Sequence, residues 1–187
     1  MITRKEFFSR CAAACTAGLS CSLGHAQEPV SAQPTCDPEE AKHLKERADA
    51  ARERFAHLLN EMEILGRESE RKQLLRGLGG WCAYTYQSEL INRYKGDIRG
   101  FLDAGLRLWM AEARYDEATG TIQVADRFTT CSCPLVKEGV TPPSFCDCTL
   151  GWQEATYSTI LGRPVKAELK ESILRGDKRC SYEIRVI

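Results

Sequence analysis

The sequence predicts an α+β domain in which N-terminal helices pack on a small antiparallel sheet that ends in a C-terminal β-hairpin. Helical periodicity dominates the first half of the chain, whereas short alternating runs, which are typical of strands, dominate its end. Apolar residues make up 43% of the 187 residues, which is enough for a hydrophobic core. These observations favour a single cysteine-rich domain over residues 37–187.

The first helix is predicted to begin at Asp37, which can cap it, with Pro38 at the first helical position. Apolar residues then recur at helical spacing as far as Leu65, as expected for one face of a long helix. This face contains many alanines and could serve a homodimer, although packing on the chain's own sheet is the simpler interpretation. The glycine-rich stretch 77–80 is expected to end this helical region.

The other helices are predicted over residues 81–94, 97–113 and 149–161. The strands are predicted over residues 121–124, 164–174 and 179–187. The last two strands should form an antiparallel hairpin, because a turn around Gly176 and Asp177 separates them. Between the first strand and the last helix, the predicted loop 129–148 carries a cluster of cysteines.

Residues 1–26 are interpreted as an export signal. The segment Thr3-Arg4-Lys5-Glu6-Phe7-Phe8 resembles a twin-arginine motif with Lys5 in place of the second arginine, and Gly24-His25-Ala26 is a small-x-small cleavage site. The apolar stretch between them is too short to span a membrane, which takes ~20 residues. We therefore expect a periplasmic or cell-envelope protein, exported by the twin-arginine or the general secretory route. A polar linker over residues 27–36 would follow, with no transmembrane anchor after cleavage.

The charge balance restricts the partners of the protein. The 26 basic and 26 acidic residues give a formal net charge of zero. A broad basic surface for nucleic acid needs an excess of lysine and arginine, so nucleic-acid binding is not expected. Adhesion to an anionic membrane is disfavoured for the same reason.

Cysteine is the unusual residue of this chain, with ten copies. The export signal holds three of them: Cys11, Cys15 and Cys21. The other seven are Cys36, Cys82, Cys131, Cys133, Cys146, Cys148 and Cys180. Because seven is an odd number, at least one thiol of the mature chain must be free, metal-bound or paired with another molecule.

Two Cys-x-Cys pairs form the strongest candidate site. Cys131 and Cys133 are separated from Cys146 and Cys148 by a loop that contains glycine and proline and can fold back on itself. Four thiolates can bind zinc or hold an iron–sulfur cluster, which are the candidate cofactors. Cys180 is a candidate fifth ligand, although it could equally be a small apolar residue on the last strand. Cys82 is interpreted as a core residue.

Two other fates of these cysteines stay open. In an oxidising compartment, one member of each pair could form a disulfide with a member of the other. Alternatively, the thiols could be reactive or redox-active. The spacing of one residue within each pair differs from the two residues of the familiar redox motif, which makes a redox module the weakest hypothesis.

Known catalytic patterns are missing from the mature sequence. After cleavage, its histidines are His43 and His57, both on the predicted first helix, and we expect no catalytic role for them. The sequence also contains neither a glycine-rich phosphate-binding loop nor a serine nucleophile elbow.

The C-terminal half resembles a known family. The residues that carry this resemblance are Cys131-Ser-Cys133-Pro134, Cys146-Asp-Cys148, Gly162-Arg163-Pro164-Val165, the run from Ser172 to Asp177 and Cys180-Ser-Tyr182-Glu-Ile184. They are similar to the family grouped with L-2-amino-thiazoline-4-carboxylate hydrolase and, more distantly, to 4-vinyl-reductase-type ligand-binding domains. The cysteine-bearing sensor halves of some iron–sulfur-responsive repressors end in a comparable way.

The resemblance implies an α+β domain with a small-ligand or metal site near the cysteines. We therefore expect an exported protein that binds a metal ion, an iron–sulfur cluster or a small-molecule ligand. The alternative is a hydrolase of small cyclic sulfur or nitrogen compounds, in which a cysteine would act as nucleophile or metal ligand.

Overall fold

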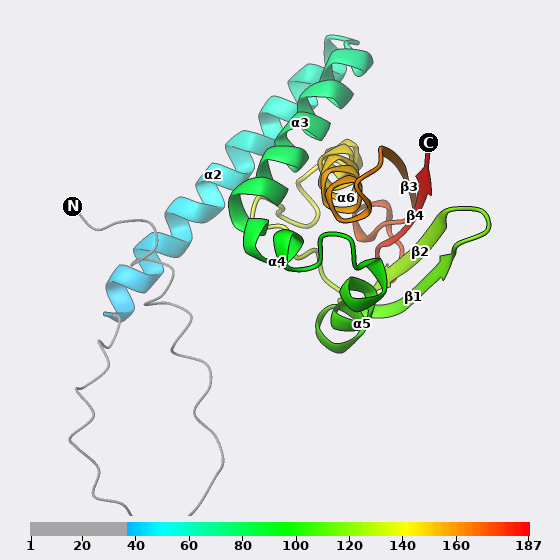
Figure 1. Cartoon of the computed structure of the whole chain (residues 1–187). Coiled ribbons are helices and arrows are strands. Elements are labelled where there is room, and N and C mark those ends of the chain that lie inside the picture. Colours follow the sequence, from blue (N-terminus) through cyan, green and yellow to red (C-terminus); the bar gives the residue numbers. More distant parts are fainter. Residues whose placement is uncertain (1–36) are drawn as a thin grey trace, which may run out of the picture. The chain divides into compact units, whose positions relative to one another are not determined.

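The computed structural model describes residues 37–187, and the predicted export signal and linker, residues 1–26 and 27–36, lie outside the described residues. Residues Pro38–Ile187 form one compact unit. Its architecture is α+β, with helices packed on a four-stranded antiparallel sheet, as the sequence predicts (Figure 1).

Helix α2, Pro38–Ile64, begins where the sequence predicts, but it ends well before the glycines of residues 77–80. Proline occupies its first position, where the missing N–H is not needed, and two glutamates in the first turn complement the positive end of the helix. The buried residues of α2 are Ala56 and Leu59, so most of this helix faces solvent. The homodimer along its alanine-rich face stays a prediction.

Helix α3, Glu68–Tyr86, continues through the glycines of residues 77–80, so the prediction that they end the helical region is wrong. The single helix predicted over residues 81–94 is also wrong, because α4, Ser88–Arg93, is separate from α3. Glycine inside a helix costs ~1 kcal/mol relative to alanine. That cost is offset by the close packing of α3 on another helix.

The helix predicted over residues 97–113 is shorter in the structure. Helix α5, Ile98–Leu108, begins after Asp97, whose carboxylate accepts a hydrogen bond from the Gly100 N–H at 2.9 Å. The following residues form strand β1, Met110–Asp116, because they pair with the next strand along the chain. Short apolar runs fit a helix or a strand equally well, and tertiary pairing decides between them.

The sheet has the strand order β1-β2-β4-β3, and all neighbours are antiparallel. Its other strands are β2, Thr121–Asp126, β3, Val165–Glu171, and β4, Ser181–Val186. Strands β3 and β4 are the predicted C-terminal pair. Ile122 lies opposite Ile184 and Val124 lies opposite Tyr182, and all four side chains are buried on the face that meets the helices.

Helix α6, Cys146–Leu161, lies between α3 and the sheet (Figure 1). Its buried residues include Tyr157 and Ile160, which belong to the main hydrophobic core with the sheet. The predicted loop 129–148 therefore ends earlier than expected. The second Cys-x-Cys pair lies in the first turn of a helix and not on a loop.

Two glycines bring α3 and α6 into backbone contact. A Cβ atom added to Gly79 of α3 would lie 1.8 Å from the Cys148 carbonyl oxygen, and one added to Gly151 of α6 would lie 2.0 Å from the Arg76 carbonyl oxygen. Neither position has room for a larger residue. An ion pair between Arg76 and Glu154 joins the same two helices.

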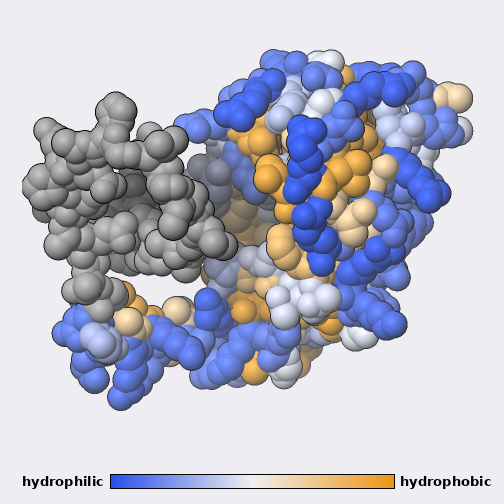
Figure 2. All heavy atoms as spheres, turned by 90° about the horizontal axis from the view of Figure 1, so that it is seen from below, coloured by the Kyte–Doolittle hydropathy of each residue, from blue (hydrophilic) through white to orange (hydrophobic). Residues whose placement is uncertain are grey.

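Apolar residues also reach the surface between charged ones, as Figure 2 shows for one face of the molecule. The end of α3 is an example, because Trp81, Tyr84 and Tyr86 are all exposed there. Among residues 37–187, every helix is too short or too polar to cross a membrane.

The glycine contact generates a stability prediction. We expect Gly79→Ala to lower the free energy of unfolding by about 3 kcal/mol, the upper end of the range for overpacked cores. Gly77→Ala is the matched control, because nothing lies within 4 Å of a Cβ there. It should raise the free energy of unfolding by about 0.5–1 kcal/mol through helix propensity. Urea unfolding followed by circular dichroism measures both values, and equal effects would contradict the contact.

Candidate functional site

Six cysteines lie around the first turns of α6, and they come from four segments of the chain. Cys82 is on α3, the first Cys-x-Cys pair is on the loop before α6, the second pair begins α6, and Cys180 precedes β4. All six thiols are free of disulfides. The sequence prediction of a cysteine site therefore gains Cys82, which we expected to be only a core residue.

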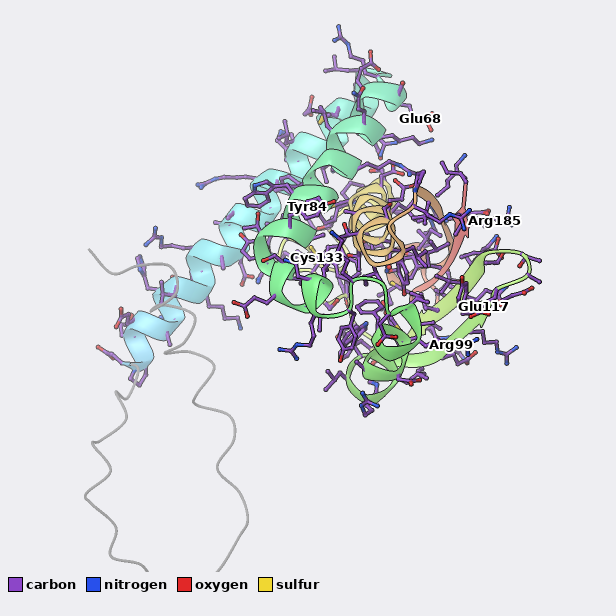
Figure 3. The ribbon with its side chains drawn as sticks, viewed as in Figure 1. Glu68, Tyr84, Arg99, Glu117, Cys133 and Arg185 are labelled. Atoms are coloured by element: carbon purple, nitrogen blue, oxygen red, sulfur yellow. The ribbon has the colours of Figure 1, made fainter. Side chains whose placement is uncertain are left out.

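Helix α2 holds the loop that carries the first Cys-x-Cys pair. The Arg52 Nε donates a hydrogen bond to the Pro134 carbonyl oxygen at 2.7 Å, and Lys137 forms an ion pair with Glu53. Within the loop, the Val136 N–H donates to the Cys133 carbonyl oxygen at 3.1 Å. These contacts hold the backbone that follows Cys133, which Figure 3 labels.

The first turn of α6 is anchored between its two cysteines. Asp147 forms an ion pair with the buried Arg71 of α3, with the Arg71 Nη1 and the Asp147 Oδ2 3.8 Å apart. The Cys146 thiol lies 3.1 Å from the Ser172 hydroxyl in the main core. Cys148 belongs instead to a second apolar cluster with Leu59, Leu75 and Phe145.

The charges of these thiols would interact with one another in two overlapping sets. Electrostatic interaction connects Cys131, Cys146 and Cys180 with one another. It also connects Cys82, Cys133 and Cys148 with one another. The two sets meet through the neighbours within each Cys-x-Cys pair. Of the five metal ligands predicted from the sequence, three belong to the first set and two to the second.

Burial keeps these thiols protonated. It raises the pKa of Cys131 to about 11 and that of Cys148 to about 12, and neighbouring thiols add to both increases. Burial also raises the pKa of Cys82, Cys133 and Cys146. Because the thiolate is the reactive form of cysteine, these groups are weak nucleophiles near neutral pH.

The cysteines are close but are not arranged as a finished metal shell. Among residues 37–187, no three side chains of histidine, cysteine, aspartate or glutamate are placed to hold a metal ion. His43 and His57 are both exposed on α2, and the Nδ1 of His57 lies 3.9 Å from a Glu61 carboxylate oxygen.

A half-buried carboxyl group beside the cysteines, that of Asp126, is not predicted from the sequence. Asp126 ends β2 on the face that meets α6, and its N–H donates to the Cys180 carbonyl oxygen at 2.9 Å. Burial raises the pKa of Asp126 to about 6, although a hydrogen bond from Tyr182 partly offsets this. Tyr157 is fully buried, and its hydroxyl has no hydrogen-bond partner among the described residues. The alternation of β2 places Asp126 on the same face as Ile122 and Val124, so extending the predicted strand beyond Val124 would have identified it.

Two open surface hollows lie away from this region. One, of about 450 Å³, is lined by residues between Thr85 and Arg93. The other, of about 440 Å³, lies over β1, β2 and β4 and is lined by residues such as Arg114 and Arg185. No cysteine lines either hollow, so neither extends the cysteine cluster.

Figure 3 also labels Arg99 and Glu117 at the opposite end of the domain from α2. The Arg99 Nη2 lies 2.8 Å from the Glu117 Oε1, and this ion pair joins α5 to the turn after β1. Both side chains are mostly exposed, so the pair contributes little to stability.

Comparison with known proteins identifies no family. No protein-family model matches the chain, and no curated protein matches its sequence. The predicted membership of the L-2-amino-thiazoline-4-carboxylate hydrolase group therefore has no support from a family model or a sequence relative and stays a prediction.

Two solved structures are distantly similar to this domain. One is trafficking protein particle complex subunit 3 from Naegleria fowleri, covalently bound to palmitic acid, with 10% identity, a TM-score of 0.46 and coverage of 76% of this chain and 96% of that chain. The other is the phenol-responsive sensory domain of the transcription activator PoxR with phenol, with 12% identity, a TM-score of 0.41 and coverage of 72% and 74%. Likenesses at this level carry no function over to this chain.

The half-buried carboxyl group of Asp126 generates a pH prediction. Its pKa of about 6 in the folded protein exceeds the value of ~3.9 expected for an unfolded chain. The folded state therefore binds more protons between these values, and this group destabilises the fold as pH rises through that window. We expect Asp126→Asn to be more stable than the wild type at pH 7, by on the order of 2 kcal/mol.

This difference should shrink towards zero near pH 4. Chemical unfolding of both proteins from pH 7 to pH 4 measures it. Carboxylates with a lowered pKa, such as Asp116 and Glu183, act in the opposite direction in both proteins and cancel in the comparison. A difference that does not change with pH would contradict the prediction.

Proposed function

We propose that this is an exported protein of the periplasm or cell envelope that binds a metal through its cysteine cluster. The observation that carries the proposal is the convergence of six disulfide-free thiols, from four separate segments, around the first turns of α6. Thiolate ligands select zinc, monovalent copper and iron–sulfur clusters over hard cations. Zinc or an iron–sulfur cluster is therefore the candidate cofactor.

Metal binding would reverse the unfavourable electrostatics of this cluster. Burial and neighbouring thiols raise the pKa of Cys131 and Cys148, so these groups enter the site as neutral thiols. A bound cation stabilises the thiolate form and releases the thiol protons to solvent. The positive end of α6 lies at Cys146 and favours the thiolates further.

The described residues give the hydrolase alternative less support. Burial raises the pKa of the thiols where a cysteine nucleophile needs a lowered one, and both histidines of the domain are exposed on α2. A hydrolase built on this site would have to use a metal-bound water, and so would depend on the same cysteines.

Metal content tests the proposal. The full chain, purified without oxygen, should contain zinc or iron, and its cluster thiols should resist alkylation until a chelator removes the metal. Cys146→Ser should lower the bound metal, because Cys146 is buried at the centre of the cluster. Cys36→Ser, in the predicted linker, is the matched control and should leave the metal content unchanged.

Iron–sulfur and zinc forms are distinguished by colour, since an iron–sulfur cluster absorbs visible light and a zinc site does not. A metal-free protein whose cluster thiols become cross-linked in air would overturn the proposal in favour of a disulfide framework. The proposed export is tested by fusing a reporter after residues 1–26. A reporter that does not reach the periplasm would overturn it.

A further inference from the structure

Helix α2 carries an apolar stripe that the rest of the domain covers only in part. Its residues alternate by four and three positions, a repeat that is typical of a helix packed along another helix. The stripe consists of Leu44, Ala48, Ala51, Phe55, Leu58, Met62 and Leu65. All seven stay at least partly exposed, and the buried residues of α2 are Ala56 and Leu59 instead.

The inner contacts of the α2–α3 hairpin set the direction of its other side chains. Leu59 of α2 and Leu75 of α3 meet in the second apolar cluster, and an ion pair joins Glu63 to Arg71 one helical turn nearer the connection. The two helices therefore run antiparallel. In an antiparallel pair, the residues that precede the two facing leucines turn to the same side of the hairpin.

Leu58 and Leu74 are those residues, and they define the outer face of the hairpin. Leu58 is 54% exposed and Leu74 is 63% exposed. Ala51 and Leu65 are seven positions from Leu58, and Trp81 is seven positions from Leu74. Seven positions are close to two full helical turns, so these residues lie on the same face. The outer face is thus an apolar surface shared by both helices.

Helix α6 covers the opposite side of the hairpin. Arg76 follows Leu75 by one position, so it turns away from the outer face, and it forms an ion pair with Glu154 of α6. Gly79 is two positions before Trp81 and meets the backbone of α6. Figure 1 accordingly shows α3 between α2 and α6. The domain packs on one side of α3 and leaves the outer face to solvent.

Exposed apolar side chains are concentrated on this hairpin. Thirteen large apolar side chains are exposed among residues 37–187, and eight of them belong to residues 44–86. Such a concentration marks an interaction surface. Residues 38–86 carry nine acidic and nine basic side chains, so this surface has no excess charge to attract an anionic membrane. The same balance allows two copies of the hairpin to meet without net repulsion.

The size of the outer face fits a dimer. Helix α3 has 19 residues and is therefore about 28 Å long. Two neighbouring helices are about 20 Å wide, so the face that they share covers on the order of 600 Å². Stable interfaces take about 600–1,000 Å² from each partner. The stripe of α2 alone would be about half as wide and too small, so α3 has to contribute.

We infer that two copies of this chain associate through the outer faces of their α2–α3 hairpins and form a four-helix bundle around a two-fold axis. Both copies contribute the same side chains to such an interface. Leu58 and Leu74 lie near its middle, because they adjoin the facing leucines of the hairpin. The inference names a partner for the domain and does not depend on metal binding.

The molar mass of the full chain in solution tests the inference. Sedimentation equilibrium is measured in a reducing agent, which prevents disulfides between chains. The chain concentration is raised to about 100 μM, so that a dimer with a dissociation constant of about 10 μM is detected. We expect a mass of twice the 21.0 kDa of one chain.

Two variants locate the interface. Leu58→Glu and Leu74→Glu should each raise the dissociation constant of the dimer at least about 100-fold, because a two-fold interface then holds two carboxylates in apolar surroundings. Both side chains are half exposed, so the folded monomer should tolerate the charge. Trp81→Ala, which adds no charge, should weaken the dimer in the same direction. Circular dichroism confirms that each variant is folded.

Leu108→Glu is the matched control. Leu108 ends α5, outside the hairpin, and is 64% exposed, which is close to the value for Leu74. This variant should leave the dimer unchanged.

Two results would overturn the inference. A chain that stays monomeric at the highest concentration would mean that the outer face does not bind a second copy, and the proposed metal-binding function would stand. A dimer that persists in both Leu58→Glu and Leu74→Glu, or that Leu108→Glu weakens equally, would place the interface elsewhere.

Discussion

The backbone contact between α3 and α6 is the constraint on which the rest of this domain depends. Gly79 and Gly151 allow the two helices to touch, and the Arg76–Glu154 ion pair secures the same interface. This contact holds α6 between two apolar clusters, one shared with the sheet and one shared with α2 and α3. It also sets the position of Cys82 relative to Cys148, so the packing of two helices determines which thiols can meet.

Much of the architecture follows from sequence patterns alone, and the errors have a common cause. The start of α2, the C-terminal strand pair and the α+β class are confirmed, because helical periodicity and strand alternation are strong there. The errors at residues 77–80 and at β1 arise where tertiary contacts override local preference. Glycines usually end helices, but here they are the surface on which a second helix packs. A single sequence does not distinguish these two uses.

The candidate site was predictable in its residue types and less so in its geometry. The paired cysteines mark the region at once, and all of the predicted ligands lie around the start of α6. The division of the thiols into two sets could not be predicted, because it depends on the second pair lying on a helix and not on a loop. Cys82 and Asp126 were missed for a different reason. Each is isolated in the sequence and meets the others only through α3–α6 packing or strand pairing.

The proposed ligand set has a consequence for biosynthesis. The thiols come from segments between residues 82 and 180, and the last of them precedes the final strand of the sheet. A nascent chain that still lacks its C-terminal strands therefore could not assemble the complete cluster. Metal would be acquired only after the whole domain has folded. The compartment in which folding takes place would then decide which metal ions compete for the thiols. For an exported protein, the choice between a pathway for folded chains and one for unfolded chains would thus also choose the metal.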